Sequence, residues 1–109
     1  MSRQPSEAEI HAEVLRVLGA RPDLRLWRAN TGAAIDTHTH RLIRFGVPGQ
    51  ADLSGILAGG RRLEIEIKSA RGRQTPEQLF FGAMIARFGG LYVVAHSLQD
   101  ALFAIEEVL

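Results

Sequence analysis

Residues 62–69 read RLEIEIKS and form the clearest strand pattern in the chain. Apolar side chains at positions 63, 65 and 67 alternate with charged side chains at positions 64, 66 and 68, the period of a β-strand. Side chains two residues apart share a face, so Glu66 and Lys68 are expected to project together. Charged faces of this kind are common on solvated edge strands, and the E-x-K spacing alone leaves that interpretation open.

The segments on either side of this strand predict an α/β fold in a single domain, residues 1–109. A helix over 7–18 begins with a capping box, Ser6 to Glu9. The strand over 91–95 follows a helix, and such a crossover is normally parallel and right-handed. We therefore expect a central mixed β-sheet flanked by helices, in the order α-β-β-β-α-β-α. The remaining predicted elements are strands over 24–28, 52–57 and 62–69, an irregular excursion or hairpin over 33–44, a helix from Pro76 to about Phe88, and a last helix capped by Ser97.

Composition excludes several classes of protein. The chain has 109 residues, of which 46% are hydrophobic, and it contains no cysteine. Disulfides, thiolate metal sites and thiol nucleophiles are therefore excluded. No apolar run reaches the ~20 residues that a membrane span needs. The sequence has no P-loop, and we expect no organic cofactor. These features predict a cytoplasmic protein with no membrane partner. Trp27, Phe80 and Phe81 are expected in the core.

The charge is unevenly distributed although the net charge is only +1. Between Arg21 and Arg73 the chain has nine arginines and one lysine against five acidic residues. Arginine forms forked hydrogen bonds with phosphate, so this central excess indicates a negatively charged partner. A coding preference for arginine is the alternative.

Asp52, Glu66 and Lys68 are expected to converge on one site. Asp52 begins a strand just after the loop at 45–50, and 13 residues separate it from Glu66-Ile67-Lys68. A hairpin between them would place the two carboxylates on neighbouring strands. Paired carboxylates with the Ile67 carbonyl form an oxygen-rich site suited to Mg²⁺ or Mn²⁺. With Lys68 nearby to orient a water or stabilise phosphate charge, the arrangement suits metal-assisted phosphodiester hydrolysis.

In order and spacing, these motifs resemble the PD-(D/E)XK nuclease superfamily, and within it the stand-alone VRR-NUC domain. The resemblance covers nearly the whole chain, although Gln50-Ala51 stands where the superfamily often has Pro-Asp. The matching stretches are WRANTG (27–32), RFGVPGQADL (44–53), Gly60-Arg61, EIEIK (64–68), Gly72-Arg73 through Gln78, and Phe88-Gly89-Gly90.

The resemblance implies a restriction-endonuclease-like core and a metal-dependent DNA endonuclease. Asp52 and Glu66 would bind Mg²⁺ or Mn²⁺, and Lys68 would be the catalytic lysine. A glutamate of the first helix often completes such sites; Glu7 is favoured and Glu9 is the alternative. Gln78 matches a glutamine of the family, and it also fits a capping box with Thr75, so both roles remain open.

The resemblance further implies cleavage of branched DNA, such as Holliday junctions, by a homodimer. Five residues on or beside the motifs are candidate DNA contacts: Arg28, Asn30, Arg44, Arg71 and Arg73. Asn30 also fits an Asx turn, and each arginine taken singly fits a solvated surface. Alternatives are a non-catalytic nucleic-acid-binding module with the nuclease fold and a nuclease for flap DNA, nicked DNA or RNA. His38 and His40, near Asp36, could hold Zn²⁺ or lie at an exposed hairpin tip.

Overall fold

The structure is a computed structural model that describes residues 3–29 and 32–109. Most elements lie within two residues of their predicted bounds, and the excursion at 33–44 belongs to a hairpin. The strand predicted over 62–69 ends earlier, at Ile67, because the chain turns into a loop where Gly72 N–H donates to Ser69 O. The elements are α1 (Glu7–Gly19), β1 (Leu24–Arg28), β2 (Gly32–Ile35), β3 (Leu42–Phe45), β4 (Leu53–Leu57), β5 (Arg62–Ile67), α2 (Pro76–Arg87), β6 (Leu91–Ala95) and α3 (Leu98–Val108).

Four strands form the main sheet, in the order β1-β4-β5-β6. Strands β1, β4 and β5 are antiparallel neighbours, whereas β6 runs parallel to β5 after the crossover through α2. The predicted mixed sheet flanked by helices is therefore confirmed. Because β4 runs into β5 through a tight turn, the start of β4 and the end of β5 lie at the same edge of the sheet.

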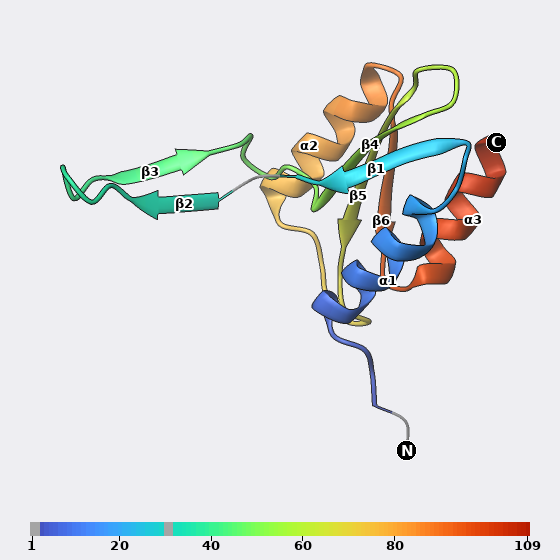
Figure 1. The fold of residues 1–109 in the computed structure, drawn as a ribbon, viewed down its shortest axis with the longest axis horizontal. Coiled ribbons are helices and arrows are strands. Elements are labelled where there is room, and N and C mark those ends of the chain that lie inside the picture. The colour runs from blue at the N-terminus through green and yellow to red at the C-terminus, as the bar shows by residue number, and fades with distance from the viewer. Residues whose placement is uncertain (1–2, 30–31) are drawn as a thin grey trace.

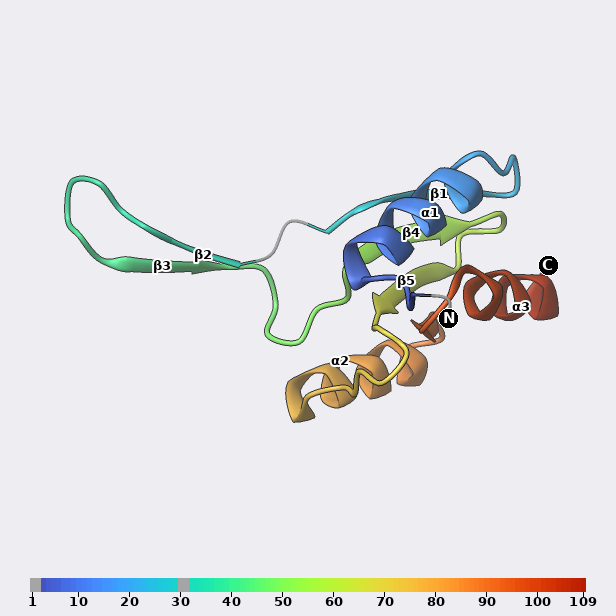
Figure 2. The ribbon, with the colours of Figure 1, turned by 90° about the horizontal axis from the view of Figure 1, so that it is seen from below.

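The helices cover the two faces of the sheet unequally (Figure 2). Helix α1 packs on β1 and β5, and α3 packs on β6 and on α1. Their buried side chains form the larger core, which includes Val14, Leu18, Leu53, Ile65 and Ile105. Helix α2 packs on β5 and β6 from the other side, where Phe81 and Ile85 form a smaller core with Ala51.

Strand β5 is buried on both faces, although its sequence alternates like that of a half-exposed strand. Glu64 and Glu66 are both buried, so the interpretation of this face as a solvated edge is wrong. The reason is that α2 covers the face on which they lie. Both carboxylate oxygens of Glu64 have partners: Ser54 donates to Oε2 at 2.7 Å, and the Arg62 guanidinium lies 2.6 Å from Oε1. In the part of the chain that the structure describes, Glu66 has partners on Oε1 alone, Gln78 and Lys68.

Strands β2 and β3 form a separate two-stranded arm that projects from the main sheet (Figure 1). The arm explains why the radius of gyration is 15.0 Å, when a compact chain of this length has about 13 Å. Ile35, Leu42 and Ile43 are exposed along it. At its tip, the Asp36 carboxylate accepts hydrogen bonds from the backbone N–H groups of His38 and Thr39.

Two aromatic side chains that were expected in the core lie on the surface. Trp27 is 51% exposed because it points to the sheet face opposite α1, and α2 does not extend over β1. Phe80 is 82% exposed on the outer side of α2, whereas its neighbour Phe81 is buried as predicted. None of the helices in the described part of the chain is both long and apolar enough to cross a membrane.

Candidate active site at the edge of the sheet

Asp52 lies immediately before β4, where the loop at 46–50 leads into the sheet. Gly49 in this loop has a φ of +76° and passes so close to α2 that a Cβ atom would lie 2.1 Å from Glu77 O. This contact fixes the path of the chain into Asp52. The Asp52 Oδ2 atom then accepts a hydrogen bond of 2.8 Å from the backbone N–H of Ile67, which ties the start of β4 to the end of β5.

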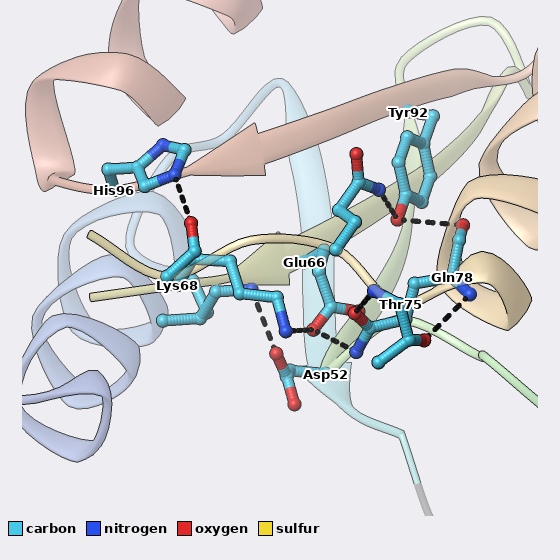
Figure 3. A network of polar contacts seen from close by, with 10 residues as sticks. Asp52, Glu66, Lys68, Thr75, Gln78, Tyr92 and His96 are labelled. Carbon is cyan, nitrogen blue, oxygen red and sulfur yellow. Dashed lines mark hydrogen bonds and ion pairs between the residues drawn. The ribbon is translucent and has the colours of Figure 1, made fainter. Parts of the chain in front are cut away.

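Glu66 projects from β5 on the α2 side and is only 2% exposed. Its Oε1 atom accepts a hydrogen bond of 3.1 Å from Gln78 Nε2 (Figure 3). Its Oε2 atom is buried and has no partner within the described residues. Burial, together with the adjacent Asp52 carboxyl group, raises the pKa of Glu66 to about 8. A fold that leaves a buried carboxylate oxygen unpaired beside a second carboxylate is well suited to a cation.

Lys68 is the cationic group of the site. Its Nζ atom lies 3.9 Å from Glu66 Oε1, and its side chain is 11% exposed. The long stem of Lys68 is therefore held against the protein while the ammonium group stays beside the carboxylates (Figure 3). The ion pair is too long for a strong hydrogen bond, which leaves the ammonium protons available to another acceptor.

Gln78 forms the capping box that the sequence allowed, and it also contacts Glu66. Its Oε1 atom accepts from Thr75 N–H at 2.9 Å, and Thr75 Oγ1 accepts from Gln78 N–H in return, which forms the capping box of α2. The amide nitrogen of the same side chain donates to Glu66. The start of α2 thereby positions a carboxylate on β5.

Tyr92 on β6 supports this arrangement and was not identified from the sequence. Its hydroxyl oxygen accepts from Gln74 Nε2 at 2.9 Å, and it lies 3.4 Å from the Gln78 carbonyl oxygen (Figure 3). Burial, and next the charge of Glu66, raise the pKa of Tyr92 to about 12. Gly82 leaves the space for its ring, since a Cβ atom there would lie 2.5 Å from Tyr92.

The two glutamates of α1 have different surroundings. Glu9 is occupied by the Ser6 capping box and by an ion pair of 2.6 Å with Arg3. Glu7 instead lines the same hollow as Asp52 and Ile67, and its charge contributes to the raised pKa of Glu66. Within residues 3–29 and 32–109, no three His, Asp or Glu side chains are grouped closely enough to hold a metal ion. The structure therefore assembles the pair Asp52 and Glu66, with Glu7 near but outside it.

Two hollows meet at Asp52. The first, of about 500 Å³, lies between α1 and the end of β1, and it includes Arg28. The second, of about 430 Å³, lies between the base of the arm, the loop at 46–50 and the start of α2, and it includes Arg44. The arm and the N-termini of α1 and α2 lie toward the same end of the main sheet (Figure 2), and residues from all three line the hollows beside Asp52.

The remaining candidate contacts are distributed differently. Arg71 and Arg73 are exposed on the loop after Lys68 and line neither of these hollows. Asn30 lies outside the described residues. His38 and His40 lie at the exposed tip of the arm, where the Asp36 carboxylate is already used by the turn. His11 and Arg16 line the first hollow and were missed, although His11 stands one helical turn after Glu7.

A comparison with protein-family models, curated proteins and solved structures gives no match. The function of the chain is therefore inferred from the geometry of this site.

Proposed function

We propose that the chain is a metal-dependent DNA endonuclease that acts on branched DNA as a homodimer. The single observation that carries the proposal is the unpaired, buried Oε2 atom of Glu66 beside the Asp52 carboxylate. Buried carboxylates normally find hydrogen-bond donors, as Glu64 does on the same strand. Within the described residues the Oε2 atom of Glu66 has no such donor, and Asp52 lies beside it. Either a shared proton or a cation relieves the repulsion between the two carboxylates, and this supports a site for a divalent cation.

The donor set fits Mg²⁺ or Mn²⁺. Asp52, Glu66 and the Ile67 carbonyl would hold the ion through oxygen, the ligand type that these ions prefer. In an extended residue the N–H and C=O groups point to the same side of the strand, and the Ile67 N–H points to Asp52. A bound ion would supply charge stabilisation for the phosphodiester and a more acidic water.

The other residues of the site would position the attacking water, the metal ligands and the DNA phosphates. Lys68 would orient the attacking water and stabilise negative charge that develops on the phosphate oxygens. Gln78 would fix the rotamer of Glu66 through its amide nitrogen while it caps α2. Arg28 lines the first hollow and Arg44 lines the second, and the two hollows meet at Asp52. There the two arginines would bind phosphates of the DNA strand.

The proposal of a branched substrate and a homodimer comes from the resemblance to stand-alone VRR-NUC domains. Paired cuts across a two-fold junction require two active sites, which a dimer supplies. The exposed apolar side chains of the arm, Ile35, Leu42 and Ile43, offer surface that a second chain could bury. Sedimentation at micromolar concentration, with and without junction DNA, tests this part: a monomer in both conditions overturns the paired-cut model.

Cleavage of a labelled four-way junction and a matched linear duplex tests the activity, with Mg²⁺, Mn²⁺ or EDTA. We expect metal-dependent, symmetric junction cuts that fall at least about 100-fold in Lys68→Ala, the scale of a general acid–base contribution. Arg87→Ala, at the far end of α2, is the matched control and should cleave normally. Binding without cleavage in every metal would indicate a non-catalytic module. Cleavage of linear DNA alone would retain the nuclease and exclude the junction substrate.

A further inference from the structure

The first hollow extends well beyond the residues to which the reaction assigns a role. It begins at Asp52 and Ile67 and continues along α1 from Glu7 to Arg16, which is roughly 13 Å at 1.5 Å per residue. Its volume of about 500 Å³ falls in the range of ligand sites, roughly 300–1,000 Å³. Neither Glu7 nor the metal pair requires a hollow of this length.

The small side chains of Ala8 and Ala12 create the space. They stand one turn apart on α1 and both are exposed, while Leu15 adds an apolar wall. Larger residues at these two positions would cost the helix nothing, because Leu and Lys have helix propensities close to that of alanine. The hollow therefore depends on side chains whose small size has no evident role in folding.

Two arginines line this space, one from α1 and one from β1. Arg28 is the last residue of β1 and shares a face with Leu24 and Leu26, which point toward α1. Arg16 approaches from the other end of α1. Within the described part of the chain neither guanidinium has an ion-pair partner, whereas Arg3, Arg21 and Arg62 each have one. His11 completes the lining between the carboxylate end and Arg16.

We propose that this hollow is a binding subsite for the nucleotide that adjoins the scissile phosphate. Arg16 and Arg28 bind its phosphodiester, and the sugar lies against Ala8 and Ala12. This inference rests on the proposed nuclease function, because it takes the DNA strand to cross Asp52. It adds a direction: the strand leaves the site along α1, over Ala8, Ala12 and Arg16, which the sequence motifs do not mark.

Two substitutions test the subsite by different means. Ala12→Leu fills the hollow and leaves the charge unchanged, and Arg16→Gln removes a phosphate contact and leaves the space unchanged. Ala86→Leu, on an exposed position of α2 outside the hollow, is the matched control. Thermal unfolding of all three variants identifies any that fail to fold. Arg16→Lys separates a contact made by the guanidinium fork from favourable charge near the end of α1.

The first readout is binding of a fluorescein-labelled DNA junction in EDTA, titrated with salt. Arg16→Gln should weaken binding and reduce the log–log salt slope by about 1. Ala12→Leu should weaken binding at least about threefold with an unchanged slope, and Ala86→Leu should bind like wild type. Unchanged binding in both α1 variants overturns the subsite.

The second readout is steady-state cleavage with Mg²⁺. We expect Ala12→Leu to raise KM more than it lowers kcat, because the hollow binds a flanking nucleotide. If the wild type binds the junction and never cleaves it, the nuclease proposal fails, and the salt titration still decides whether nucleic acid occupies the hollow. If the wild type cleaves and both α1 variants match it, the subsite alone fails.

Discussion

Gln78 Nε2 donates a hydrogen bond of 3.1 Å to Glu66 Oε1, so a residue of the α2 capping box also holds a carboxylate of the candidate site. One side chain therefore couples the start of a helix to the chemistry of the neighbouring strand. The two contacts use different atoms of the same amide, which makes them separable by substitution.

Gln78→Ala should reduce both stability and cleavage, whereas Gln78→Glu should reduce cleavage alone. Alanine removes the capping contact, at a cost of about 1 kcal/mol, and frees the Glu66 rotamer. Glutamate preserves a capping box but places a further negative charge beside Glu66. Urea denaturation and junction cleavage measure the two effects. Glu9→Ala removes the equivalent contact from the capping box of α1 and should affect stability with little loss of activity. Equal activity in all three variants would contradict the coupling.

The apo protein should lose stability as the pH rises from about 4.5 to about 8. Glu66 has a pKa of about 8 in the fold, against 4.5 for an ordinary glutamate. Between these values the folded state retains a proton that the unfolded state has released, so the free energy of unfolding falls with rising pH. One unit of pKa difference corresponds to about 1.4 kcal/mol, so urea denaturation in EDTA can detect the effect.

Glu66→Gln is the matched variant for this measurement. Its stability relative to wild type should rise between pH 4.5 and pH 9, because glutamine needs no proton. Mg²⁺ should restore stability to the wild type at pH 9 and have little effect on the variant. A constant stability difference across this range would show that Glu66 ionises normally in the fold.

Gly49→Ala should destabilise the protein and reduce cleavage, because a Cβ atom would lie 2.1 Å from Glu77 O. The loop must then shift, and Asp52 shifts with it. Gly59→Ala is the matched control, since Gly59 also has a positive φ, +96°, but no atom lies within 4 Å of the added Cβ. That variant should lose only about 1 kcal/mol of stability, because alanine is strained at a positive φ, and it should cleave normally. Equal losses in the two variants would exclude the contact with α2 as the cause.

Replacing residues 33–44 with a short Gly-Ser linker should leave the main sheet folded. The arm makes its strand contacts within itself, and a two-stranded hairpin adds little stability in water. We expect a change of less than about 1 kcal/mol in the free energy of unfolding, together with weaker junction binding and a smaller salt slope from the loss of Arg41 and Arg44. Unfolding of the shortened chain would show instead that the arm is part of the core.

The sequence predicted the helices, the main strands and the neighbouring positions of Asp52, Glu66 and Lys68, because periodicity and capping residues are local signals. It did not predict that Glu66 is buried. Alternation shows which side chains share a face, but which face a helix covers is decided by the crossover through α2. The surface position of Trp27 has the same cause. His11 and Arg16 carried no motif, and only the packing of α1 against β1 brought them beside Asp52.

The parallel pairing of β5 with β6 also has a consequence for the order of folding during synthesis. The strand that carries Glu66 is completed only when residues 91–95 emerge, because β6 is its second neighbour in the sheet. Until then β5 is paired with β4 alone, and its other side is an open edge of the sheet. Tyr92 is also not yet in place to contact Gln74 and Gln78. A nascent chain that ends before β6 should therefore lack the ordered carboxylate pair, and the proposed metal binding and nuclease activity should arise only as the last strand joins the sheet.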